Sequence, residues 1–187
     1  MKEKSRAVFR GAEQKKRGST MEFILREWEK QDAEKIVRYA DNPKIAANLR
    51  NAFPYPYTLA DARAYVDSCV ANEGKRQLCR AIEIAGEPVG SIGIFLQSDV
   101  SCRCAEMGYW LAEPFWGKGV MSGAARRLCK EAFERYDLLR IFAEPFAYNT
   151  GSCRVLEKAG FELEGILKKS VIKNGQVYDS CMYALVR

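Results

Sequence analysis

Hydrophobic positions along the chain change their spacing several times, and each change marks a predicted element. Apolar residues recur every three or four positions in four stretches, which predicts helices starting near Asp32, Thr58, Gly119 and Thr150. Shorter apolar or alternating runs predict seven strands, at residues 23–25, 78–85, 88–96, 102–111, 139–146, 161–173 and 176–186. Strands that follow one another directly favour antiparallel pairing, so we expect one α+β domain with a mixed, mostly antiparallel central sheet flanked by helices.

Turn residues separate these elements. Asn174-Gly175 lies between two strand-like runs and is a strong hairpin signal. Gly160 ends a helical pattern, where glycine is the preferred residue after the last turn. The segment 53–57 reads Phe-Pro-Tyr-Pro-Tyr and cannot be helical, because each proline forces the residue before it toward extended geometry. It is therefore predicted to be an aromatic loop.

Charge is unevenly distributed. The 187 residues carry a net charge of +6, but residues 1–20 alone carry +5 and the remaining 167 residues only +1. We therefore expect a basic, disordered leader at 1–20 and a nearly neutral folded domain at 21–187. A neutral body makes nucleic acid an improbable partner, and no apolar run approaches the length of a membrane span.

The chain has no histidine, so it excludes a Ser-His-Asp triad, a Cys-His dyad and any site that needs imidazole. Seven cysteines occur without a CxxC pair, and the Cys102–Cys104 spacing does not suit a zinc site, so we expect no metal. Reduced thiols fit a cytoplasmic location best. Cys153 lacks a partner base, which favours packing over a nucleophilic role.

Candidate chemistry lies where a strand at 105–111 leads through a short loop into a helix. Gly117 and Gly119 flank Lys118 at the start of that helix and leave backbone N–H groups open, which suits a phosphate group. The spacing is neither that of a P-loop nor GxGxxG. On its own the motif is weak, because an ordinary glycine-rich turn looks the same.

Two separated motifs, the strand–loop–helix unit at 105–121 and the segment 149–161, strengthen the evidence for a phosphate site. The chain reads Ala-Glu-Met-Gly-Tyr-Trp-Leu at 105–111, Phe-Trp-Gly-Lys-Gly-Val-Met at 115–121, and Asn-Thr-Gly-Ser-Cys-Arg-Val-Leu-Glu-Lys-Ala-Gly-Phe at 149–161. In this order they resemble the GCN5-related N-acetyltransferases (GNAT), specifically the RimJ/RimL-like branch, and the resemblance runs from about residue 21 to the C-terminus. It implies a splayed pair of parallel strands, acetyl-CoA as co-substrate and a primary amine as acceptor.

The resemblance also assigns residues to the co-substrate. It places Trp110 and Leu111 beside the pantetheine arm, and it implies a further CoA contact at Asn149. The pyrophosphate cradle it implies consists of Trp116, Gly117, Lys118, Gly119, Val120 and Met121. The wider superfamily prefers Gln or Arg where this chain has Trp116 and a small residue where it has Met121, and neither change affects a mechanism based on backbone groups.

Two side chains are candidates for catalysis. Strand alternation places Glu106 on the same face as Trp110 and opposite Tyr109, so Glu106 could accept the amine proton through a water. It could equally hold a cationic amine or pair with an arginine. Many relatives have a tyrosine where this chain has Leu156. The resemblance points instead to Ser152, the serine typical of this branch, as the candidate acid, which could hydrogen-bond the thiolate or position a water, with helix capping as the alternative role.

The acceptor is less defined. Phe53, Tyr55 and Tyr57 are candidates for an aromatic wall of the acceptor site, and the same residues suit a hydrophobic plug or a homodimer contact. The resemblance suggests a protein N-terminal amine, as in ribosomal-protein acetyltransferases. A polyamine, an amino acid, an aminoglycoside, and a non-catalytic acyl-CoA-binding regulator stay open as alternatives.

Overall fold

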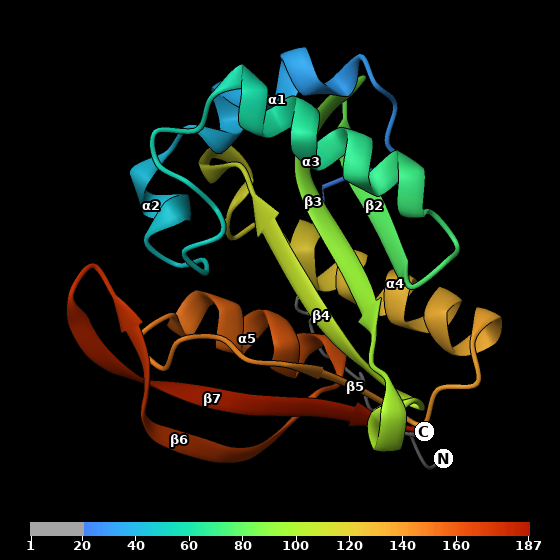
Figure 1. The fold of residues 1–187 in the computed structure, drawn as a ribbon, viewed down its shortest axis with the longest axis vertical. Helices are drawn as coiled ribbons and strands as arrows, with labels where there is room; N and C mark the ends of the chain where they lie inside the picture. Colours follow the sequence, from blue (N-terminus) through green and yellow to red (C-terminus); the bar gives the residue numbers. More distant parts are fainter. Residues whose placement is uncertain (1–20) are drawn as a thin grey trace, which may run out of the picture.

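A computed structural model describes residues 21–187, so the predicted leader at 1–20 lies outside the described residues. Seven strands form one sheet in the order β1-β2-β3-β4-β5-β7-β6 (Figure 1). Their bounds are β1 Ile24–Arg26, β2 Gln77–Ile84, β3 Glu87–Leu96, β4 Cys104–Leu111, β5 Arg140–Ala143, β6 Glu162–Lys173 and β7 Gln176–Val186. All neighbouring pairs are antiparallel except β4 and β5, which confirms the predicted α+β sheet.

Helices cover both faces of the sheet. They are α1 Asp32–Ala40, α2 Pro43–Ala46, α3 Leu59–Asn72, α4 Val120–Arg135 and α5 Thr150–Ala159. Figure 1 shows α1 and α3 together on one side of the sheet, away from α4 and α5. The four longer helices were predicted, whereas the single turn of α2 was missed because four residues cannot establish a helical period.

Each face of the sheet has its own hydrophobic core. One core joins α4 and α5 to strand residues that include Ile92, Met107 and Leu111. The other joins α1 and α3 to strand residues that include Ala81 and Trp110. Met107 and Leu111 therefore face away from Trp110, which confirms the alternation predicted along β4.

The parallel pair is short. Its register runs from Cys104↔Arg140 to Glu106↔Phe142, while β4 continues to Leu111. The predicted strand at 139–146 is thus limited to Arg140–Ala143, because the chain turns away at Pro145 to form an isolated bridge from Phe146 to Ser180. β4 and β5 start side by side and then diverge (Figure 1), which confirms the predicted splayed pair.

Local interactions set several element ends. Thr58 caps α3 in a reciprocal capping box with Asp61, as its sequence position predicted. The β6–β7 turn places both Asn174 (φ 51°) and Gly175 (φ 75°) in the left-handed region, which a two-residue hairpin of this type requires.

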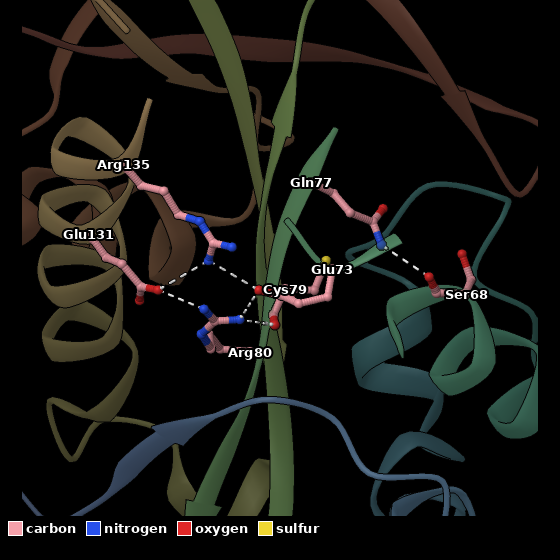
Figure 2. A network of polar contacts seen from close by, with 7 residues as sticks. All are labelled: Ser68, Glu73, Gln77, Cys79, Arg80, Glu131 and Arg135. Carbon is pink, nitrogen blue, oxygen red and sulfur yellow. Dashed lines mark hydrogen bonds and ion pairs between the residues drawn. The ribbon is translucent and has the colours of Figure 1, made fainter. Parts of the chain in front are cut away.

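A polar network ties the C-terminal end of α3 to β2 and α4 (Figure 2). Buried Arg80 donates to Glu73 (2.9 Å) and to Glu131 (2.6 Å). Arg135 also contacts Glu73, at 3.3 Å. This network lies outside the cleft described below and joins helices from the two faces of the sheet.

Within residues 21–187, no helix combines the length and the hydrophobicity needed to cross a bilayer. The same residues contain no group of three or more Cys, Asp or Glu side chains arranged to hold a metal ion.

Candidate active site

A cleft of about 1190 Å³ passes beside the diverging strands and reaches elements on both faces of the sheet. Its walls contain most of the residues that the sequence singled out: Phe53, Tyr57, Glu106, Trp110, Leu111, Trp116, Gly117, Gly119, Val120, Met121, Asn149 and Ser152. Two predicted residues do not line the cleft. Lys118 holds its ammonium group 5.8 Å from the centre of the Phe115 ring, and Tyr55 is 56% exposed.

The divergence of β4 and β5 frees one backbone edge. The Ala112 N–H donates to the Val89 carbonyl of β3 at 2.8 Å. Because β3 and β4 are antiparallel, every second residue of β4 counted back from Ala112, beginning with Trp110, directs its backbone N–H and C=O groups toward β3. Tyr109 and Leu111 consequently direct their backbone groups toward the opposite edge. No strand among residues 21–187 pairs with that edge beyond Glu106. This part of β4 can therefore accept hydrogen bonds from an extended ligand and donate to it.

Trp116 is fixed at the end of the same edge. Its indole Nε1–H donates to the Leu111 carbonyl at 2.6 Å, and the residue is 42% exposed. The Leu111 carbonyl is thereby occupied, while its N–H remains directed toward the cleft. Trp116, which was predicted to belong to the phosphate cradle, thus also covers the end of the open β4 edge.

The N-terminus of α4 opens into the cleft. Gly117 (φ 72°) and Gly119 (φ 76°) both adopt left-handed backbone conformations, which glycine tolerates best. Gly119 is the N-cap and offers no capping side chain, and the first turn of Val120–Arg135 contains no acidic residue. Because the first N–H groups of this 16-residue helix lack internal partners, they form a site for an anion.

Asn149 and Ser152 begin α5. The Asn149 side chain accepts from the Ser152 N–H (3.1 Å), so Asn149 is a helix N-cap whatever else it does. The Ser152 hydroxyl lies 2.7 Å from the Tyr109 hydroxyl, and either oxygen can be the donor. Burial raises the pKa of Tyr109 well above its usual value, so its hydroxyl keeps its proton at neutral pH.

Glu106 pairs with Arg50. The Arg50 Nη1 donates to Oε2 at 3.3 Å and its Nη2 donates to Oε1, which makes a two-point contact. The Glu106 side chain is 21% exposed on a central strand, whereas Arg50 is 66% exposed in the turn region between α2 and α3. Of the roles predicted for Glu106, pairing with an arginine is therefore the one present here.

Aromatic side chains form part of the wall of the cleft that Glu106 also lines. The rings of Phe53 and Tyr57 stack with 4.8 Å between their centroids, and Phe53 meets Trp110 edge-on at 6.0 Å. Burial raises the pKa of Tyr57 to about 12, so it is neutral over the physiological range. Two of the three predicted aromatic residues thus form an apolar surface in the same cleft as the Glu106 carboxylate.

Sequence reasoning missed several residues of the cleft. Arg50, Tyr109, Tyr148, Arg154 and Lys158 all line it. Arg154 and Lys158 occur four residues apart in a predicted helix, and this spacing could have marked a basic face. Nothing in the local sequence pairs Arg50 with Glu106, because the two are 56 residues apart.

Comparisons with known proteins agree with this geometry. A family model described as the acetyltransferase (GNAT) domain matches residues 22–162. YjcK of Bacillus subtilis (strain 168), a probable N-acetyltransferase, is 39% identical over 98 residues, which are 52% of this chain and 54% of that protein. In Escherichia coli (strain K12), the L-amino acid N-acetyltransferase AaaT is 26% identical over 89% of this chain and 99% of its own. The ribosomal-protein-serine acetyltransferase of the same strain is 33% identical over 45% of this chain and 47% of its own.

Solved structures share the fold. RimJ of Mycobacterium smegmatis, in complex with CoA-disulfide, superposes with a TM-score of 0.78 and 26% identity, over 88% of this chain and 81% of that one. The microcin C7 self-immunity acetyltransferase MccE, in complex with acetyl-CoA and AMP, also has a TM-score of 0.78. Its identity is 24%, over 89% of this chain and 93% of that one, so this likeness concerns the fold alone.

Proposed function

The chain belongs to the GNAT family of acetyltransferases, acyltransferases with acetyl-CoA as co-substrate, and from that premise we propose that it transfers the acetyl group directly to an α-amine in a ternary complex. One observation carries the proposal. A single cleft reaches the N-terminus of α4 on one face of the sheet and Glu106 on the other, through the gap between β4 and β5. Donor and acceptor can therefore approach from opposite faces and meet at β4.

The donor side uses backbone groups. The phosphates of acetyl-CoA bind the free N–H groups at the start of α4, and Arg154 and Lys158 of α5 add positive charge to the same cleft. The pantetheine amides pair with the open edge of β4 at Tyr109, and the arm continues past Leu111, whose N–H is left for the acetyl group. Asn149 caps α5 by accepting a hydrogen bond from the Ser152 N–H, and it thereby positions the first turn of the helix beside the cleft.

The chemistry needs three groups. Glu106 accepts a proton from the acceptor ammonium, directly or through a water, and the neutral amine attacks the acetyl carbonyl. The Leu111 N–H donates to the oxyanion that forms. The C–S bond then breaks as the C–N bond is completed, and the nitrogen loses its second proton. Ser152, held by the Tyr109 hydroxyl, relays that proton to the departing thiolate, so that both hydroxyls end the cycle protonated.

The environment of Cys153 favours direct transfer over a covalent acetyl-enzyme. Burial raises the pKa of the Cys153 thiol above its usual value, and Cys153 does not line the cleft. A protonated thiol outside the site is a poor nucleophile, which argues against an acetyl-enzyme.

An α-amine is the acceptor that the family relatives favour. One relative is named for serine of a ribosomal protein and another for L-amino acids. A protein N-terminus and a free amino acid share the α-amino group. The proposal therefore covers both, and cytoplasmic location with either substrate remains a prediction.

The test measures thiol release from acetyl-CoA with a panel of amines, for wild type and Glu106→Gln. We expect kcat/KM to fall about 10²- to 10⁴-fold in the variant, because general-base catalysis is lost. Glu87→Gln is the matched control, since Glu87 pairs with Arg38 on the surface away from the cleft. Full turnover in Glu106→Gln would remove Glu106 as the base. Acetyl-CoA binding without turnover on any amine would favour a non-catalytic regulator.

A further inference from the structure

Arg50 gives the acceptor end of the cleft a cation that the proposed chemistry does not use. Its guanidinium makes a two-point contact with the Glu106 carboxylate, and both side chains line the cleft. Among the described residues that line the cleft, the other cationic side chains are Lys44, which is paired with Glu113, and Arg154 and Lys158 of α5. Arg50 therefore stands directly where the acceptor must approach the proposed base.

This ion pair is complementary to a zwitterion. We propose that Arg50 is the specificity-determining residue of the acceptor site, and that it binds the carboxylate of a free α-amino acid whose ammonium group contacts Glu106. The inference rests on the proposed function, because it assumes that Glu106 receives the amine. A bidentate guanidinium suits a planar carboxylate better than an ammonium group would.

Charge compensation favours this acceptor over the alternatives. When an α-amino acid enters, Arg50 exchanges the Glu106 carboxylate for the acceptor carboxylate, and Glu106 exchanges the guanidinium for the acceptor ammonium. Every charge keeps a partner. A polyamine or an aminoglycoside would bring only positive charge against Arg50, and a peptide N-terminus would separate Arg50 from Glu106 without offering a carboxylate beside its amine.

The exchange is mechanically feasible because the two partners differ in freedom. Glu106 is held on a central strand with its side chain 21% exposed. Arg50 is 66% exposed and lies in a turn between helices, so its long side chain can withdraw and return without moving the sheet.

The boundary of the cleft also fits a small acceptor. The Tyr148 hydroxyl donates to the Ala47 carbonyl at 2.6 Å and so joins the loop before α5 to the residue that ends α2. Tyr148 and Asn48 both line the cleft beside this contact. A bridge between the two walls narrows the route that a polypeptide chain would need. The apolar surface of Phe53 and Trp110 then suits an apolar side chain on the amino acid.

The experiment compares L-leucine, L-leucinamide and the dipeptide L-leucylglycine as acceptors, with thiol release as the readout. The amide keeps the α-amine and the side chain but lacks the carboxylate. For wild type, we expect kcat/KM for leucine to exceed that for leucinamide roughly 10- to 100-fold, the effect of one charged hydrogen-bonded contact. In Arg50→Met this ratio should fall toward one, and Arg50→Lys should recover part of it. Arg38→Met removes an exposed arginine paired with Glu87 outside the cleft, and it should keep the wild-type ratio.

Each contrary result has a distinct meaning. Equal kcat/KM for leucine and leucinamide in wild type, a dipeptide preferred over leucine, or an unchanged ratio in Arg50→Met would overturn the role of Arg50 and leave the transferase intact. Preference for the dipeptide would point to a protein N-terminus as acceptor. Absence of turnover with every amine, spermidine included, would instead overturn the proposed function on which the inference rests.

Discussion

The hydroxyl oxygens of Tyr109 and Ser152 lie 2.7 Å apart and connect β4, the strand that carries Glu106, to the first turn of α5. Tyr109 is on the face of β4 opposite Glu106, so the two groups border the cleft from different sides. A raised pKa keeps the Tyr109 hydroxyl protonated. In the proposed mechanism this is the donor side of the cleft, where the pair would serve the departing thiolate.

The first prediction concerns this pair. Ser152→Ala removes the proposed proton donor, and we expect kcat to fall about 100-fold. Tyr109→Phe removes the hydroxyl behind it and should lower kcat by a smaller factor. Because the two hydroxyls act as one unit, the double variant should be little slower than Ser152→Ala alone. Steady-state thiol release measures kcat, and calorimetric titration shows whether acetyl-CoA binding is retained. Strictly additive losses in the double variant would contradict a shared role.

The second prediction tests the anion site at the start of α4. Gly119→Asp places a carboxylate at the N-cap, where it repels phosphate, and we expect the Kd for acetyl-CoA to rise at least about tenfold. Gly119→Asn is the matched control, since asparagine has nearly the same shape and the same strain at φ 76° without the charge. Calorimetric titration of both variants separates charge from strain. Equal Kd values for the two would show that this N-terminus does not bind the phosphates.

Much of this site could be predicted because its signals are local. Gly117 and Gly119 predict a left-handed turn before a helix, and the backbone has a positive φ at both residues. Alternation along 105–111 separates Glu106 and Trp110 from Tyr109, and the two cores confirm it. Both features depend on residues a few positions apart, which periodicity and turn chemistry describe well.

The rest depends on contacts between distant segments. Arg50 lies in a polar turn region whose pattern predicts nothing, and its role follows only from a partner 56 residues away. Tyr148 donates to Ala47 across 101 residues. Tyr55 resembles Phe53 and Tyr57 in sequence, yet the loop turns its side chain outward while Tyr57 is buried. Composition can place three aromatics in one loop, but only tertiary packing decides which of them reach the cleft.

The third prediction is a loss of stability at alkaline pH. Burial raises the pKa of Tyr57 to about 12 and that of Tyr109 further, whereas unfolded tyrosine titrates near pH 10. The contribution of these neutral, buried tyrosines to the free energy of unfolding is complete below pH 10 and is lost as the pH rises through their folded-state pKa values. We expect the free energy of unfolding to fall above pH 10 by up to about 1.4 kcal/mol per pH unit for each such tyrosine.

Urea titrations at several pH values between 8 and 11.5 measure this slope. Tyr57→Phe should make it shallower by the contribution of one proton. Tyr55→Phe, at an exposed position of the same loop, is the control and should keep the wild-type slope. A slope in Tyr57→Phe that equals wild type would contradict the assignment to Tyr57.

The last prediction concerns the network of Figure 2. Arg80 is buried and donates to Glu73 and Glu131, so Arg80→Ala leaves two carboxylates without their main partner and opens a gap between α3 and α4. We expect a loss of about 2 kcal/mol in the free energy of unfolding. Arg80→Met keeps the length of the side chain and should cost less than Arg80→Ala. Since the network lies outside the cleft, the Kd for acetyl-CoA should match wild type in both variants.

Arg63→Ala provides the comparison for this test. Arg63 pairs with Glu34 at 3.4 Å, and both side chains are more than half exposed, so its loss should cost no more than about 1 kcal/mol. Urea unfolding followed by circular dichroism ranks the three variants. If Arg80→Ala were no less stable than Arg63→Ala, burial would add nothing to the Arg80 contacts, and the connection between the two faces of the sheet would have to come from the hydrophobic cores alone.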